Sequence, residues 1–269
     1  PDMKIVNNGL ELALDYKSDP KGSFTYNFGG NITYIQNKVV DSPYAVLVTG
    51  AAQGSGQTGA TINGYINNEP IGAFYMYDFE GVKDGISVYT DTNKDGKVLD
   101  NDRAVVGSAI PKLIYGFYSN FNYKNFQLGL NFNGMSGSKV FNHTAMTLFP
   151  KALLAQSNNT TDFAVQYPNE TLANANIVST RYLEDGSFLR LNNATLAYNV
   201  QPSKVGLGNA FQNIQFSVTG QNLFVLTDYS GFDPEVNTGS TSGGIQTFGI
   251  DRFTYPKART FLIGLNLTF

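Results

Sequence analysis

The last nine residues of the chain alternate between two kinds of side chain. From Phe261 to Phe269 every second position is a large apolar residue. From Gly264 onward the positions between them are small or polar, with Leu262 as the exception before that point. A period of two is typical of a β-strand with one apolar and one polar face. Such a strand fits the edge of a sandwich or the wall of a transmembrane barrel. The apolar positions are Phe261, Ile263, Leu265, Leu267 and Phe269.

The composition narrows the choice of protein class. Charged residues make up 14% of the chain, well below the roughly 25% of ordinary soluble domains. The chain has no Cys, which excludes a disulfide scaffold and Cys-ligated zinc. Its net charge of −3 gives no basic surface for nucleic acid. No stretch of 18 residues is apolar enough for a transmembrane helix, whereas the alternating strands of a barrel have near-neutral mean hydropathy.

The same alternation recurs along the chain and predicts an all-β fold. The clearest example follows the tight turn Lys124-Asn125, where Phe126, Leu128, Leu130 and Phe132 alternate with polar or small residues. The predicted strands are 9–17, 23–35, 112–124, 125–134, 187–200, 213–226 and 258–269. Residues 37–111 lose the clean pattern. Residues 135–185 are predicted to be loop-like, with a short helix near 140–154.

The order of these strands predicts a direction for each of them. Bacterial outer-membrane barrels usually finish on an aromatic residue such as Phe269, so we expect the C-terminus on the periplasmic side. Counting back then gives short turns at 18–22, 124–125 and 201–212 on the periplasmic side. The long connections 36–111, 135–186 and 227–257 fall outside the cell, as barrels require. Since single-chain bacterial barrels have even strand numbers, seven strands predict the C-terminal part of a longer barrel.

Several motifs, in order along the chain, resemble the SusC/RagA family of TonB-linked outer-membrane transporters. The motifs are NGLEL at 8–12, DTNKDG at 91–96, FLRLNN at 188–193, GQNL at 220–223, DYSGFDPE at 228–235 and YPKART at 255–260. The resemblance implies a barrel of 22 strands around an N-terminal plug, of which residues 1–269 would be the C-terminal portion. It also implies a place in the outer membrane of a Gram-negative bacterium, in contact with its lipid.

The resemblance implies a function in nutrient uptake. Members of the family import glycan oligosaccharides or peptides together with a SusD-like surface lipoprotein, and TonB acts through an N-terminal part outside these residues. The family consists of transporters, so no enzyme activity is expected. The alternative that the residues leave open is a secreted, calcium-stabilised β-sandwich that binds carbohydrate.

One local motif predicts a metal site within the long connection 36–111, which we expect to be an extracellular insertion. Oxygen ligands at positions 1, 3, 5 and 12, with Gly at position 6, match the spacing of an EF-hand loop. The backbone carbonyl of Lys97 would supply position 7. The predicted calcium ligands are Asp91, Asn93, Asp95, Lys97 and Asp102. The alternative is an Asp/Asn/Gly turn without a metal.

The remaining candidate residues are aromatic or apolar. Aromatic residues of the long connections are candidates for contact with substrate or with the lipoprotein, or for packing within the loops; they include Tyr75, Tyr77, Tyr89, Tyr229 and Phe232. The apolar strand positions are expected to face lipid: Phe126, Leu128, Leu130, Phe132, Phe261, Ile263, Leu265, Leu267 and Phe269. The polar strand positions are expected to face the barrel lumen: Gln127, Asn131, Asn133, Ser217, Thr219 and Gln221.

Two apparent enzyme signatures have simpler explanations. The glycines Gly54, Gly56 and Gly59 satisfy the spacing of a dinucleotide-binding turn, but no helix pattern follows to receive a pyrophosphate. His143 is the only histidine of the sequence, which excludes a site built from several histidines.

Overall fold

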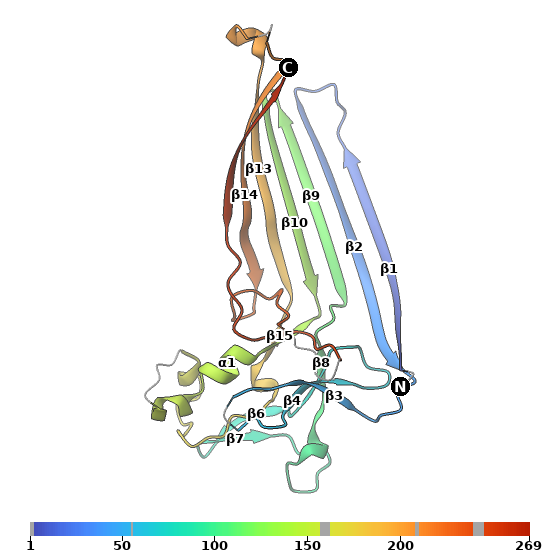
Figure 1. The fold of residues 1–269 in the computed structure, drawn as a ribbon. Coiled ribbons are helices and arrows are strands. Elements are labelled where there is room, and N and C mark those ends of the chain that lie inside the picture. The colour runs from blue at the N-terminus through green and yellow to red at the C-terminus, as the bar shows by residue number, and fades with distance from the viewer. Residues whose placement is uncertain (1–2, 55, 157–161, 208–209, 239–244) are drawn as a thin grey trace.

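The protein consists of one long antiparallel sheet with a layer of short elements at one of its ends (Figure 1). The computed structural model describes residues 3–54, 56–156, 162–207, 210–238 and 245–269. The strands of the long sheet are β1 (Lys4–Lys17), β2 (Phe24–Val40), β9 (Leu113–Tyr123), β10 (Phe126–Ser136), β13 (Phe188–Val200), β14 (Asn213–Thr227) and β16 (Thr260–Thr268). Each pairs with the next in chain order.

These seven strands confirm the predicted all-β class, and a partial barrel fits their order. Two predicted boundaries are wrong, because β1 begins before residue 9 and β2 continues past residue 35. The pairing of β1 with β2 runs on to Lys4↔Val40. Hydrogen bonding between Asn37 and Asn7 joins this extension. Its side chains do not alternate in hydrophobicity, which is why the sequence pattern ended too early.

The register of the ladders keeps side chains of one kind on one face. One row of directly paired residues crosses six strands and is apolar throughout. It consists of Tyr26, Phe121, Leu128, Leu196, Val218 and Ile263. The adjacent row consists of Thr25, Asn122, Gln127, Ala197, Ser217 and Gly264, which are polar or small. Because neighbouring positions of a strand point to opposite faces, the sheet has one apolar and one polar side.

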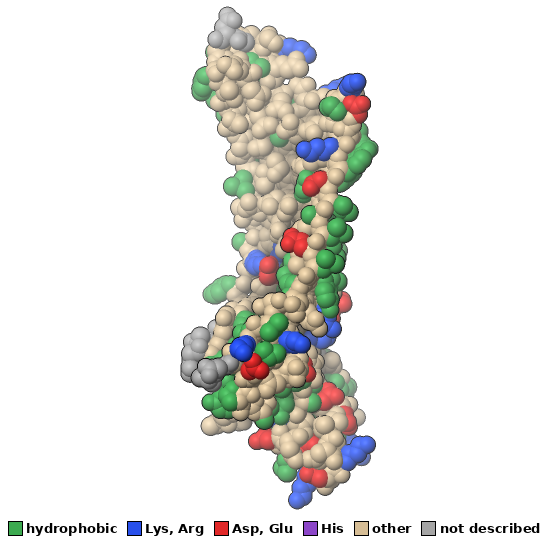
Figure 2. Space-filling view, turned by 90° about the vertical axis from the view of Figure 1, so that its right-hand side faces the viewer, with side chains coloured by type: hydrophobic (Ala, Val, Ile, Leu, Met, Phe, Trp, Pro, Cys, Tyr) green, Lys and Arg blue, Asp and Glu red, His purple; other side chains and the backbone are tan. Residues whose placement is uncertain are grey.

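The apolar side is largely exposed. Ile263 is 88% exposed and Phe261 is 71% exposed, and among the described residues neither a second sheet nor a helix covers them. Figure 2 shows hydrophobic side chains gathered along one side of the elongated part of the molecule. In the part of the chain that the structure describes, β1 and β16 each pair on one side only, so they form the two open edges of the sheet.

All the long connections lie at the same end of the sheet and fold into an outer layer (Figure 1). This layer contains β3 (Leu47–Ala51), β4 (Thr61–Tyr65), β5 (Ala73–Met76), β6 (Phe79–Lys83), β7 (Ile86–Tyr89), β8 (Ala104–Ser108), β11 (Lys139–Asn142), β12 (Leu183–Asp185) and β15 (Ile250–Asp251). Its helices are η1 (Asp100–Asp102), α1 (His143–Leu148), η2 (Lys151–Gln156), η3 (Asp162–Val165) and η4 (Thr180–Tyr182). The short turns and η5 (Pro202–Val205) lie at the opposite end.

The outer layer has a hydrophobic core to which distant segments contribute. Ile62, Phe74, Phe141, Met146 and Ile250 are buried in one cluster, so the three long connections pack as a single unit. The prediction that residues 135–185 are loop-like was therefore wrong for β11 and β12, and residues 37–111, which lack the pattern, form the short strands β3 to β8. Strands of two to five residues are too short for an alternation that a sequence pattern could detect. No helix of the described residues has the length and hydrophobicity to cross a membrane.

Candidate functional site

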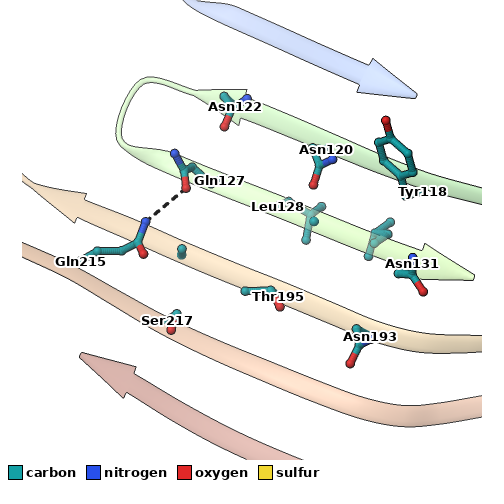
Figure 3. A pocket seen from close by; sticks show the side chains of 13 residues that line it. Tyr118, Asn120, Asn122, Gln127, Leu128, Asn131, Asn193, Thr195, Gln215 and Ser217 are labelled. Atoms are coloured by element: carbon teal, nitrogen blue, oxygen red, sulfur yellow. Dashed lines mark hydrogen bonds between the residues drawn. The ribbon is translucent and has the colours of Figure 1, made fainter. Parts of the chain in front are cut away.

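The polar side of the long sheet carries a shallow cavity of about 540 Å³. Its wall comes from four neighbouring strands, β9, β10, β13 and β14 (Figure 3). The residues lining it are Tyr118, Asn120, Asn122, Gln127, Leu128, Gly129, Leu130, Asn131, Asn193, Thr195, Ala197, Gln215 and Ser217. Three of the residues predicted to face the lumen, Gln127, Asn131 and Ser217, are among them.

The lining of this cavity is uncharged and rich in hydrogen-bonding groups. Gln215 on β14 is hydrogen-bonded to two other strands. Its Nε2 donates to Oε1 of Gln127 on β10 at 3.2 Å (Figure 3) and to Oδ1 of Asn199 on β13 at 2.9 Å. The hydroxyl groups of Thr195 and Thr219 lie 2.9 Å apart. Amide and hydroxyl groups can donate and accept, so this surface suits a polar, neutral ligand or a packed polar domain.

A buried ion pair fastens the last long connection to the polar side of the sheet. Arg190 on β13 donates to both carboxylate oxygens of Asp233, at 2.8 and 2.9 Å. Both side chains are almost completely buried. Arg190 also donates to Asn222, whose Nδ2 donates to the carbonyls of Lys257 and Ala258. Nη2 of Arg190 contacts both oxygens of Asp233 while Nη1 binds Asn222, so these charge-assisted contacts hold both ends of the connection at the rim of the sheet.

Three of the predicted aromatic contacts belong to the outer layer and are half-buried. Tyr75 lies under the guanidinium of Arg103, whose central carbon is 4.8 Å from the ring centroid. Tyr77 donates its hydroxyl proton to Asp100 at 2.9 Å. Tyr89 packs against Tyr77 with 5.8 Å between ring centroids. Each ring therefore has a packing role within the layer, and contact with a substrate or a partner stays a prediction.

The other two aromatic residues are three positions apart in sequence and differ in exposure. Tyr229 is 5% exposed, and its hydroxyl donates to Asp251 at 2.6 Å. Burial, followed by this hydrogen bond, raises the pKa of Tyr229. Phe232 is 69% exposed and lines an open cavity of about 600 Å³ beside α1. Of this pair, only Phe232 presents its ring to a ligand.

The predicted metal loop is closed by hydrogen bonds of its own. Asp91 accepts the N–H of Gly96 at 2.8 Å, and Asp95 accepts the N–H of Lys97 at 2.9 Å. Asn93 Oδ1 accepts the N–H of Asp95. Gly96 has a φ of +82°, a conformation that glycine adopts without strain. This is the sharp turn that the spacing predicts.

Asp102 is buried, and its carboxylate stabilises the same loop by accepting backbone hydrogen bonds. Its Oδ1 accepts the N–H groups of Thr92 and Asn93, and its Oδ2 accepts the N–H of Leu99. The bond from Leu99 comes first among the causes that lower the pKa of Asp102. A carboxylate has about four lone-pair sites, so only one on Oδ2 stays free. Across the described residues, no group of three or more His, Cys, Asp or Glu side chains is arranged to hold a metal ion.

Comparison with known proteins identifies the type of chain. No protein-family model matches the sequence. TonB-dependent receptor P3 of Formosa agariphila is 29% identical over 99% of this chain. TonB-dependent receptor SusC of Bacteroides thetaiotaomicron is 26% identical over 98% of it. The structure of the RagAB peptide importer in its open-open state covers 98% of the chain with a TM-score of 0.77 at 19% identity.

The chain matches a SusC/RagA-type fragment. It spans 29% of the length of the Formosa receptor and 26% of SusC. The likeness to RagAB extends to the fold, with the long sheet and the outer layer both inside the matched region.

Several residues that shape this chain have no distinctive sequence signal. Arg181 is paired with Glu170 through two bonds of 2.8 Å, and both side chains are buried. Asp251 is buried beneath Tyr229. In the sequence these are isolated charges in long connections, where charged residues are usually solvated. The motifs FLRLNN and DYSGFDPE were the only available signal for the Arg190–Asp233 pair.

His143 provides a test of how tightly the outer layer is packed. The ring is fully buried and accepts the N–H of Gln53 at 2.9 Å. Burial lowers the pKa of His143 from 6.5 to about 4. The unfolded state therefore takes up a proton that the folded state excludes. The free energy of unfolding of the outer layer is therefore highest above about pH 6.5. It falls as the pH drops toward 4, by about 3 kcal/mol in total.

We expect His143→Gln to flatten this pH dependence of outer-layer stability, even if it lowers stability at pH 7. The measurement is protease resistance of the outer layer in the whole receptor at pH 7 and pH 4.5, for wild type and variant. Equal losses of resistance in both proteins would show that His143 does not carry the effect.

Proposed function

We propose that this chain forms the C-terminal part of the barrel of a TonB-dependent outer-membrane importer in a Gram-negative bacterium. The importer takes up glycan oligosaccharides or peptides together with a SusD-like surface lipoprotein. TonB acts through an N-terminal part of the whole protein. Residues 36–111 form an extracellular insertion within this arrangement.

One observation supports the proposal above the others. The sheet has an exposed apolar side and a hydrogen-bonding polar side, and its long connections all lie at one end. That combination suits a wall between hydrocarbon and a polar lumen, because lipid-facing and lumen-facing residues alternate in such barrels. A sandwich, the alternative fold, would cover the apolar side with a second sheet.

The similarities agree with this proposal. The curated relatives are TonB-dependent receptors, and the matched structure is a peptide importer that contains RagA and RagB. By analogy with that pair, a surface lipoprotein would sit on the outer layer of this chain. The choice between glycan and peptide is left to the transport experiment.

Import is tested in cells that produce the whole receptor and its neighbouring lipoprotein. We expect growth on an oligosaccharide or a peptide mixture as the limiting nutrient to require both the receptor and TonB. The control is growth on a monosaccharide or on free amino acids, which must stay normal. Unchanged oligomer-dependent growth after deletion of the receptor would contradict the proposal.

The proposed orientation of the sheet is tested by two adjacent positions of β10. In the ladders Leu128 belongs to the apolar row and Gln127 to the adjacent polar row, so their side chains point to opposite faces of the sheet. Leu128→Arg should reduce the amount of folded receptor in the outer membrane, because an Arg on the lipid-facing side is unfavourable, by up to about 2–4 kcal/mol at the middle of the bilayer and less toward its surfaces. Gln127→Arg is the matched control and should leave assembly near the wild-type level. The readout is the heat-modifiable folded band in membrane fractions, and equal effects of both substitutions would argue against a lipid-facing surface.

We also propose that calcium stabilises the loop Asp91–Asp102 on the outer surface. The support is the EF-hand-like spacing, together with the turn at Gly96 and the oxygen atoms of Asp91, Asn93 and Asp95 that gather around it. The carbonyl of Lys97 and the free lone pair of Asp102 would complete the set. With Asp in place of the usual Glu at the last position, we expect an affinity on the order of 10⁻⁴ to 10⁻³ M, as in extracellular modules.

Calcium binding is tested by protease protection of this loop in the whole receptor. We expect 5–10 mM calcium to slow cleavage within residues 91–102 by severalfold over a chelator, at a concentration well above the expected dissociation constant. Asp95→Ala should abolish the protection. Asp19→Ala removes an exposed carboxylate from a turn at the other end and should not alter the protection. Equal cleavage rates with calcium and with chelator would rule out the site.

A further inference from the structure

The open cavity beside α1 combines aromatic rings with a buried carboxylate. It has a volume of about 600 Å³ and lies where the connection after β14 meets the segment before β16. The lining residues are Asn142, Thr144, Leu148, Phe149, Ser230, Gly231, Phe232, Asp251, Phe253, Thr254, Tyr255 and Pro256. We call this set the α1 pocket. None of its lining residues is a Lys, Arg or His.

The aromatic residues of the α1 pocket are available to a ligand. Tyr255 is 94% exposed, Phe232 is 69% exposed and Phe253 is 50% exposed. They come from two separate segments of the last long connection. The Arg190–Asp233 pair described above holds one of these segments in place. The aromatic rim is therefore exposed in solvent but built on a fastened backbone.

Asp251 lines this pocket, and its carboxylate forms no ion pair among the described residues. Asp251 is 3% exposed and accepts hydrogen bonds from the hydroxyl groups of Tyr229 and Thr254. Among the residues that the structure describes, no Lys, Arg or His forms an ion pair with it. The guanidinium of the adjacent Arg252 donates instead to the carbonyl of Ala51 at 2.7 Å. His143 is uncharged near pH 7, because burial lowers its pKa to about 4.

A second carboxylate adds to the negative charge behind the pocket. Glu184 on β12 accepts the N–H and the hydroxyl proton of Ser230, at 2.7 and 2.8 Å, and the Nδ2 proton of Asn142 at 2.8 Å. Both donors line the α1 pocket. Glu184 also has no ion-pair partner in the part of the chain that the structure describes. Two negative charges thus lie behind an aromatic rim. Asp251 is buried and Glu184 is half-buried, and hydroxyl, amide and N–H groups rather than cations are their partners among the described residues. Buried charges in proteins are normally paired, so a cation brought to this pocket would find opposite charge.

From this geometry we infer that the α1 pocket binds the cationic side chain of a peptide, a lysine ammonium or an arginine guanidinium. The inference rests on the proposed function and specifies its substrate class as a basic peptide. The rings of Phe232, Phe253 and Tyr255 would contact the cation by cation–π interactions. Asp251 would supply the opposite charge. The apolar rim would cover the methylene groups of the side chain, as apolar surfaces do for long basic residues.

A neutral glycan suits the α1 pocket less well than a basic peptide. The polar atoms that line it already have partners inside the protein: Ser230 and Asn142 donate to Glu184, and Thr144 accepts the N–H of Phe253 at 2.8 Å. Few polar groups are left to hydrogen-bond sugar hydroxyls, and uncompensated negative charge gives a neutral ligand no advantage. The polar cavity on the sheet has the opposite character, with many amides and no charge.

The test measures binding of two matched peptides to the whole receptor in detergent by isothermal titration calorimetry. One is acetyl-Ala-Ala-Lys-Ala-Ala-amide, and the other has norleucine in place of lysine, which keeps the chain length and removes the charge. We expect the lysine peptide to bind at least about tenfold more tightly, in line with a charge-assisted contact. Asp251→Asn should remove most of this difference. Asp84→Asn, which removes an exposed carboxylate from the same layer, should not change it.

Because Asp251 is buried, its substitution could reduce the amount of folded protein. A second pair of variants therefore changes exposed residues of the pocket. Phe232→Leu and Tyr255→Leu change exposed rings and should weaken binding of the lysine peptide by severalfold without loss of folded protein. Tyr44→Leu alters another exposed ring outside the pocket and serves as the control. Unchanged affinity in both ring variants would overturn the inference.

Other outcomes separate this inference from the proposed function. Equal binding of the lysine and norleucine peptides, in a receptor that still supports growth on oligomeric nutrients, would overturn the basic-peptide site and leave the import function standing. Binding of a neutral dextrin or of a glucosamine oligomer that depends on Asp251 would overturn the assignment to peptides. If deletion of the receptor leaves growth unchanged on both the oligosaccharide and the peptide mixture, the import function is contradicted, whatever the pocket binds.

Discussion

The structure depends on the in-register pairing of two-faced strands. Alternation gives one strand two faces, but only the register between strands makes those faces continuous across a sheet. In the row from Tyr26 to Ile263 an apolar residue pairs with an apolar residue on each successive strand. A slip of one residue at any ladder would place polar side chains among them. Burial of apolar surface against another phase therefore selects one register for the whole sheet.

The outer layer is held to this sheet by polar interactions more than by continuous packing. Its own hydrophobic core is small and lies away from the strands. The connection to the sheet comes from groups such as Arg190, which ties Asp233 and Asn222 together at the rim. Glu170 and Arg181 act in the same way within the layer, where Arg181 also lies 5.1 Å from the ring of Tyr167. Breaking one member of such a pair leaves the other charged and buried, which is strongly unfavourable. The layer is consequently specific in geometry although it is short of regular structure.

The long strands could be predicted from the sequence because the hydrophobicity of each residue in an exposed two-sided sheet follows the face on which its side chain lies. Leu128 and Gln127 differ in hydrophobicity because they face different surroundings. The outer layer gives no such signal, since Ile62, Phe141 and Ile250 meet only after three connections have folded together. The same holds for the α1 pocket. Phe232 could be named as a surface aromatic, but the buried state of Tyr229 and the unpaired charge of Asp251 depend on long-range packing that no local pattern contains.

The two open edges of the sheet have a consequence for the chain in isolation. Along β1 and β16, a line of amide and carbonyl groups has no strand beside it among the described residues. In hydrocarbon each such unpaired group costs several kcal/mol, so an open strip cannot rest in a bilayer by itself. In water the same borders would act as templates for further strands, and the exposed apolar side would add to the attraction. Produced alone, these residues would therefore gather into stacked aggregates. Further strands paired to β1 and β16 would remove both borders.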